Sequence, residues 1–139
     1  MSSISFETDL LIARPADEVF AYVADPRRFP EWNSAVESVA ATRDGYVMRR
    51  RLPGGAATNG LEVVERDPPG AFTIRTTSGP TPFVYRYRFE PTGGGTVVRL
   101  AAEVVLSGAA ALAGPLAARA IRRGVDANLA TLRAILERG

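Results

Sequence analysis

Apolar and polar residues alternate along the start of the chain. The residues on one side of the alternation are Ile4, Phe6, Thr8, Leu10 and Ile12. The other side carries mostly polar residues, such as Ser5 and Glu7. Because successive side chains of a strand point to opposite faces, this period of two predicts a strand with one buried face.

A short helix is predicted to follow this strand. Pro15 suits the first turn of a helix, because its missing N–H would be unpaired there anyway. The apolar stripe that follows consists of Val19, Phe20 and Val23. Asp25-Pro26 should end the helix, since the residue before a proline is disfavoured in the α region. We expect a second short helical turn or loop to lead to Trp32.

From Val36 onward, strand-like segments alternate with glycine and proline. Strands are expected near 36–42, 45–53, 60–67, 71–78, 82–91 and 95–107. The turn signals between them are typical of hairpins, so the strands, seven with the first one, should form an antiparallel meander. The segment from Pro53 to Gly60 is rich in small residues and is expected to be a plain hairpin loop or a mobile gate.

The last part of the chain returns to a helical spacing of apolar residues. That stripe consists of Leu116, Ile121, Val125, Leu129, Leu132 and Leu136. Arg122 with Asp126 and Arg133 with Glu137 form i,i+4 pairs on the opposite face. Pro115 should lie at the start of this helix, or kink it if the helix begins earlier.

Three segments carry a resemblance to a known family. They are ARPADEVFAYVADPRRFPEW at 13–32, YRYRFEPTGGGTVV at 85–98 and ANLATLRAILE at 127–137. With the order of elements, they resemble the START-like (SRPBCC) superfamily, particularly its polyketide cyclase/dehydrase-like branch. This resemblance implies an α+β helix-grip fold: a seven-stranded curved antiparallel sheet around a long C-terminal helix, with two short helices between strands one and two. We expect a single domain over residues 1–139 with an elongated apolar cavity.

The composition excludes several kinds of chemistry. With no cysteine and no histidine, the chain cannot form disulfides or thiolate metal sites, and it lacks the commonest general base. We expect no metal and no organic cofactor. All 17 basic residues are arginine and the net charge is +2, without the clusters of basic and aromatic residues that nucleic-acid binding requires. No apolar stretch is long enough to span a bilayer, so we expect a cytoplasmic protein without stable membrane insertion, either a monomer or a homodimer.

Alternation also indicates which side chains should face a cavity. Phe83, Tyr85 and Tyr87 share one face of their strand, and this aromatic face should be the inner one. Arg50 shares a face with Met48; it should either enter the pocket, where it needs an acidic partner or an anionic or carbonyl-bearing ligand, or reach water near the sheet edge. The complete set of expected ligand-binding residues is Trp32, Met48, Arg50, Phe72, Ile74, Phe83, Tyr85, Tyr87, Leu100, Leu112, Leu116, Val125 and Asn128.

Three functions are compatible with these features. The leading hypothesis is the binding of a hydrophobic small molecule that is lipid-like, polyketide-like or aromatic. The resemblance also implies a cyclase or dehydrase, in which Tyr85 or Tyr87 would donate a proton to an enolate while Arg50 stabilised its charge; no carboxylate is clearly placed as a base. The third possibility is a partner-binding module that uses the convex face of the sheet. The arginines of that face are Arg86, Arg88 and Arg99.

Overall fold

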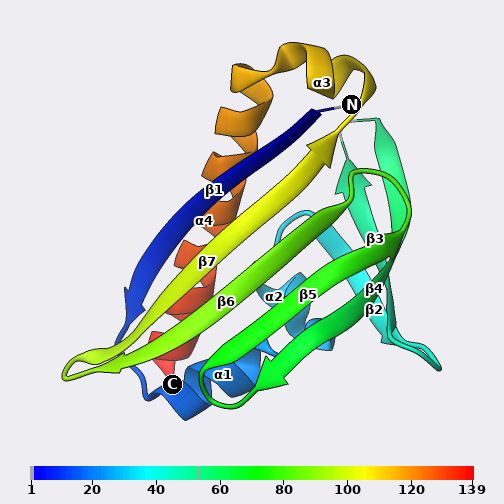
Figure 1. The fold of residues 1–139 in the computed structure, drawn as a ribbon. Coiled ribbons are helices and arrows are strands. Elements are labelled where there is room, and N and C mark those ends of the chain that lie inside the picture. The colour runs from blue at the N-terminus through cyan, green and yellow to red at the C-terminus, as the bar shows by residue number, and fades with distance from the viewer. Residues whose placement is uncertain (1, 53) are drawn as a thin grey trace.

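The core of the structure is a seven-stranded antiparallel sheet with the order β1-β7-β6-β5-β4-β3-β2 (Figure 1). A computed structural model describes residues 2–52 and 54–139. Its strands are β1 (Ser2–Ile12), β2 (Val36–Ala41), β3 (Tyr46–Leu52), β4 (Gly55–Asp67), β5 (Ala71–Ser78), β6 (Phe83–Thr92) and β7 (Gly95–Leu106). From β2 to β7, neighbours in the sheet are neighbours in the chain, and β1 joins the edge beside β7. The predicted meander is confirmed.

Two short α-helices connect β1 to β2. They are α1 (Ala16–Val23) and α2 (Phe29–Trp32), and the 3-10 turn η1 (Pro26–Arg28) lies between them. The side chain of Asp25 accepts a hydrogen bond from the backbone N–H of Arg27 and so caps this turn. The predicted end of the first helix at Asp25-Pro26 is therefore confirmed, and so is the helix-grip fold.

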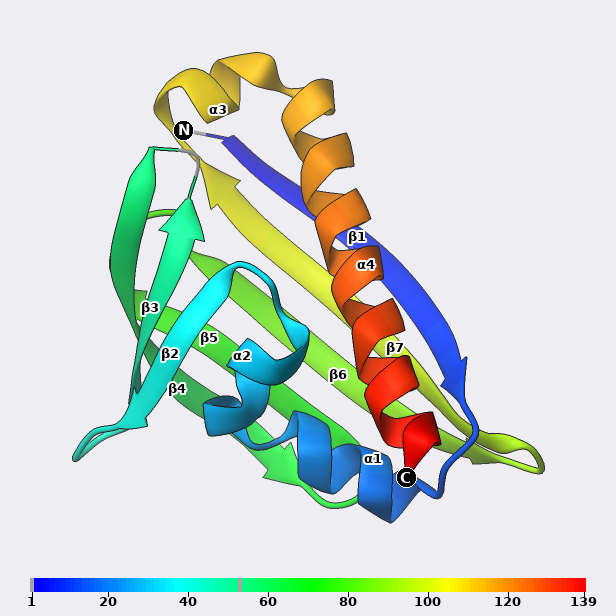
Figure 2. The same ribbon diagram turned by 180° about the vertical axis from the view of Figure 1, so that it is seen from behind.

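The long helix α4 (Pro115–Arg138) lies across the concave side of the sheet (Figure 2). Its buried side chains are Val125, Leu129 and Leu132. Two polar contacts fix its C-terminal end to the segment after β1: Arg14 Nε donates to the carbonyl of Leu136 at 2.8 Å, and the N–H of Ala13 donates to Glu137 at 2.8 Å. The helix is thus held by an apolar stripe along its length and by hydrogen bonds at its end.

A short helix, α3 (Gly108–Ala113), precedes α4. The helical conformation is interrupted between α3 and α4 at Gly114, which has φ 49° and ψ −115°. Glycine adopts a positive φ of this kind at low cost. Pro115 then occupies the first turn of α4, where no N–H is needed. The helix therefore starts at the proline and is not kinked by it.

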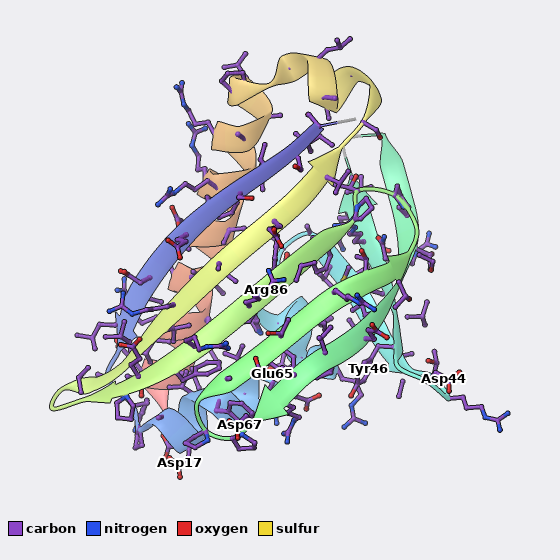
Figure 3. All side chains as sticks on the ribbon, in the orientation of Figure 1. Asp17, Asp44, Tyr46, Glu65, Asp67 and Arg86 are labelled. Atoms are coloured by element: carbon purple, nitrogen blue, oxygen red, sulfur yellow. The ribbon has the colours of Figure 1, made fainter. Side chains whose placement is uncertain are left out.

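The two faces of the sheet differ in chemistry. On β6, Phe83 and Tyr87 are buried on the concave face, whereas Arg86 and Arg88 are exposed and share the convex face. Figure 3 shows Arg86 of β6 and Glu65 of β4 on the convex face. The convex face carries cross-strand ion pairs, which join Arg75 to Glu62, Arg86 to Glu103, Arg88 to Glu65, and Arg99 to Asp9 and Glu90. Exposed pairs of this kind contribute only about 0–1 kcal/mol each, so the apolar concave face supplies most of the driving force for folding.

The predicted loop from Pro53 to Gly60 is largely strand, which corrects the expectation of a gate there. β4 begins at Gly55 and pairs with β3 from Leu52↔Gly55 to Tyr46↔Leu61; Pro53 lies outside the described residues. Small residues have weak strand propensity, so composition alone indicated a loop. Pairing with β3 supplies the missing stabilisation.

Candidate ligand cavity

A cavity of about 220 Å³ lies between the concave face of the sheet and α4. Two of its wall residues, Ala35 and Gly124, are also exposed to solvent. Ala35 lies just before β2 and Gly124 in the middle of α4, two elements that Figure 2 shows from the side of the helix. The described residues contain no group of three or more Asp or Glu side chains placed to hold a metal ion.

Most of the side chains expected at a cavity lie on this wall. They are Trp32, Met48, Arg50, Ile74, Phe83, Tyr85, Tyr87, Val125 and Asn128. Alternation along β3, β5 and β6 and the stripe of α4 indicated all of them except Trp32, which lies on α2, and Arg50, whose direction alternation left open. Asn128 also accepts a hydrogen bond from the N–H of Ser34 at 3.3 Å, which joins α4 to the segment before β2. Their part in ligand binding remains a prediction.

Four expected wall residues lie elsewhere. Phe72 and Leu100 are 0% and 2% exposed and belong to the packed core. Leu112 and Leu116 are 91% and 69% exposed and point into solvent. The break at Gly114 turns α3, with Leu112, away from the sheet. Leu116 lies on the face of α4 opposite to Val125, so neither leucine reaches the cavity.

The wall also contains residues that were not among the expected set. They are Phe29, Asn33, Ala35, Val36, Leu52, Thr81, Val104, Ile121 and Gly124. Several lie in loops or at the ends of elements, where alternation assigns no direction. Ile121 and Val104 are different, because the helical stripe and the alternation of β7 did indicate that they point inward, although neither was in the expected set of ligand-binding residues.

Arg50 is a half-buried cation on this mostly apolar wall. Its Nε donates to Asn59 Oδ1 at 2.8 Å, and its Nη2 donates to the carbonyls of Pro80 and Thr81, each at 2.7 Å. The guanidinium carbon lies 5.4 Å from the ring centroid of Phe83. The structure thus favours the inward interpretation of Arg50, but its partners are neutral, and no ion pair joins it to a carboxylate of the described residues. Burial accordingly lowers the pKa of Arg50.

Asn59 holds Arg50 in place. Its side chain is fully buried, and its Nδ2 donates to the carbonyls of Ser78 and Pro80 at 3.0 and 2.9 Å. Arg50 and Asn59 together fasten the loop 79–82 between β5 and β6 to strands β3 and β4. Arg50 Nη1 makes no hydrogen bond within the described part of the chain, so its donors are not occupied by the residues described there.

Three further side chains bring donors to the wall. Burial raises the pKa of Tyr87 and of Tyr85, and the nearby cation Arg50 opposes the rise at Tyr85. Neither hydroxyl is hydrogen-bonded to the residues that the structure describes. The buried Nε1 of Trp32 likewise lacks an acceptor there. The wall therefore offers N–H and O–H donors and carries no carboxylate among its described residues.

Alkaline pH is expected to destabilise the fold through these tyrosines. A raised folded-state pKa means that above about pH 10, the ordinary tyrosine value, the folded protein keeps protons that the unfolded chain releases. The stabilisation is complete below that pH and is lost as the pH rises toward the folded pKa. Burial and the hydrogen bond to Glu31 also raise the pKa of Tyr22, to about 12, so it adds to the same slope.

Urea unfolding between about pH 9 and about pH 11 measures this effect. Y87F, which cannot ionise at this position, should reduce the fall in the free energy of unfolding across that range. A slope equal to that of the wild type would show that the Tyr87 hydroxyl ionises equally well in both states.

The sequence matches the family described as polyketide cyclase / dehydrase and lipid transport over residues 3–137. The chain belongs to this family. A search of curated proteins found no match. Within the described residues, no helix has both the length and the apolar character needed to cross a membrane.

Three solved structures illustrate the likeness of the fold. A START superfamily protein from Mycobacterium smegmatis has a TM-score of 0.79 at 14% identity, covering 98% of this chain and 97% of that one. The Zhui aromatase/cyclase from Streptomyces sp. R1128 has a TM-score of 0.78 at 19% identity, covering 99% and 95%. The di-domain aromatase/cyclase StfQ from the steffimycin biosynthetic pathway has a TM-score of 0.72 at 20% identity; the match covers 95% of this chain and 50% of StfQ, so the chain spans half its length. At these identities the likeness concerns the fold.

Proposed function

We propose that this family member binds an apolar small molecule whose carbonyl or anionic oxygen accepts a hydrogen bond from Arg50. The observation that carries the proposal is the half-buried guanidinium on a mostly apolar wall, with Nη1 unpaired among the described residues and no carboxylate beside it. A half-buried cation without an anionic partner loses part of its hydration without compensation, which costs free energy. A ligand oxygen that accepts from Nη1 would offset part of that cost.

The other side chains of the cavity wall indicate the chemistry and size of the rest of the ligand. Aromatic and aliphatic side chains suit an aromatic, polyketide-like or lipid-like body, and Tyr85, Tyr87 and Trp32 would donate to further oxygens. The volume of about 220 Å³ is below the range of roughly 300–1,000 Å³ that is usual for drug-sized ligands. A compact ligand of one or two rings therefore fits better than a complete phospholipid.

Catalysis is a second candidate, favoured by the presence of Arg50 and Tyr85 on the same wall. The raised pKa of Tyr85 would keep its proton available for an enolate whose charge Arg50 stabilises. The described wall holds no carboxylate that could remove a proton, so binding is the better-supported function. A partner-binding role for the convex face has less support, because Arg86, Arg88 and Arg99 are all ion-paired there.

Two fluorescent probes with similar ring systems test the role of Arg50. Naphthalene-2-sulfonate carries an anionic group, and 2-methylnaphthalene lacks it; both have only two rings, as the volume of the cavity requires. The wild type should prefer the sulfonate, and R50M should weaken sulfonate binding about tenfold or more, as expected when a hydrogen bond to a charged group is lost. Binding of the neutral probe should change far less.

R51M is the matched control, because Arg51 is the next residue on β3 and pairs with Glu37 outside the cavity. It should bind both probes as the wild type does. Circular dichroism and the thermal midpoint establish that R50M is folded. The proposal fails if the wild type binds neither probe, or if folded R50M loses both equally.

A further inference from the structure

The junction of α3 and α4 carries the most exposed large apolar side chains of the described residues. We call residues 108–123 the elbow; Figure 1 shows its first part beyond the end of the sheet. Leu112 and Leu116 are 91% and 69% exposed, and α3 has no buried residue. The sequence from Ser107 to Ala118 contains no charged side chain. We call residues 108–118 the tip of the elbow. The tip is thus an uncharged apolar surface that contributes little to the core.

A basic segment follows the apolar tip. It consists of Arg119, Arg122 and Arg123, all exposed. No Asp or Glu occurs from Val104 to Val125. Arg122 lies 3.9 Å from Asp126 in the next turn, whereas Arg119 and Arg123 form no ion pair with any described residue. The elbow therefore combines exposed leucines with an excess of positive charge.

Leu116 and two arginines of the basic segment lie along one side of α4. Leu116, Arg119 and Arg123 are separated by three and four residues, so they share one face of the helix. Ile121, Val125 and Asn128 occupy the opposite face and line the cavity. The exposed face of α4 thus passes from apolar to basic over two turns, without taking part in the cavity.

We infer that the elbow docks reversibly on an anionic phospholipid surface. Leu112 and Leu116 would enter the boundary between headgroups and acyl chains, while Arg119 and Arg123 would contact lipid phosphates. A second copy of the chain is a poorer partner, because a symmetric contact would place two basic segments together without a carboxylate from either elbow. The inference does not depend on what the cavity binds.

Vesicle sedimentation with the full-length protein tests this inference. The wild type should sediment with vesicles of equal parts phosphatidylcholine and phosphatidylglycerol, and not with phosphatidylcholine alone. Added salt should weaken this binding, because it screens exposed charges. L112D/L116D should lower the affinity at least tenfold, and R119Q/R123Q about 25-fold, at about fivefold for each arginine.

Matched variants separate the elbow from general surface effects. V64D changes a 53% exposed apolar residue on β4, and R43Q/R138Q removes the same charge as R119Q/R123Q from other exposed sites. Both variants should bind vesicles with an affinity within about twofold of that of the wild type, because only charges close to the membrane surface contribute to binding. The inference is overturned if the wild type does not sediment with anionic vesicles at low salt, if it binds neutral vesicles equally, or if the controls lose as much as the elbow variants. It is also overturned if the leucines instead close a dimer that L112D/L116D dissociates.

Discussion

Replacing Asn59 by leucine is expected to lower the free energy of unfolding by about 3 kcal/mol, because buried polar partners lose their hydrogen bonds. The substitution keeps a similar volume but leaves Arg50 Nε and the carbonyl of Ser78 without the partner that Asn59 provides. The carbonyl of Pro80 keeps its bond from Arg50. Urea unfolding followed by circular dichroism measures the change.

Thr58 provides the control for this substitution. It precedes Asn59 on β4 but is exposed, so T58V should change the free energy of unfolding by no more than about 0.5 kcal/mol. In an R50M background, N59L should have a smaller effect, because one of the bonds it breaks is already absent. An equal effect in both backgrounds would show that Arg50 and Asn59 are not energetically coupled.

The fold could be predicted because its signals are periodic and local. The alternation through Phe83, Tyr85 and Tyr87 identified the concave face of β6, and the spacing of Val125, Leu129 and Leu132 identified the buried side of α4. Both patterns were confirmed. The family resemblance then joined these elements into one architecture, which the match over residues 3–137 confirms.

The polar part of the site could not be predicted in the same way. Alternation placed Arg50 on the same face as Met48 but left open whether it enters the pocket, and its acceptors at Asn59 and Pro80 lie nine and 30 residues away in the chain. Asn59 lies in a segment of small residues that looks like a loop, so nothing local indicates a buried amide. The Arg50–Asn59 contact exists only after β3 and β4 have paired.

The elbow shows the limit of helical periodicity. Leu116 was predicted to belong to the buried stripe of Val125 and Leu129. It lies nine residues before Val125, however, which at about 100° per residue places it on the opposite face of α4, and it is 69% exposed. An apolar residue near a helical stripe is buried with it only when its position around the helix agrees with that of the other members.

Gly79 is the residue of the loop 79–82 that packs closely against Asn59 and the backbone of β4. It has φ 93°, which side chains other than glycine rarely adopt. A Cβ atom there would lie 2.3 Å from the backbone oxygen of Thr58 and 2.7 Å from Asn59 Nδ2. The Thr58 oxygen belongs to β4, so relieving the clash requires the loop to move away from the strand.

Replacing Gly79 by alanine is therefore expected to lower the free energy of unfolding by about 3 kcal/mol, from backbone strain together with the lost Asn59 contact. For a domain of this size, the thermal midpoint should fall by about 10–15 °C. G93A is the control, because an added Cβ at Gly93 meets no atom within 4 Å. It should leave the midpoint nearly unchanged.

A double variant of N59L and G79A distinguishes the two contributions to this loss. Both substitutions disturb the same contact between β4 and the loop, so their combined effect should be smaller than the sum of the single effects. Full additivity would mean that Gly79 acts only through its own backbone strain. In that case the loop would keep its position on Asn59 in G79A, and Arg50 would keep both of its carbonyl acceptors.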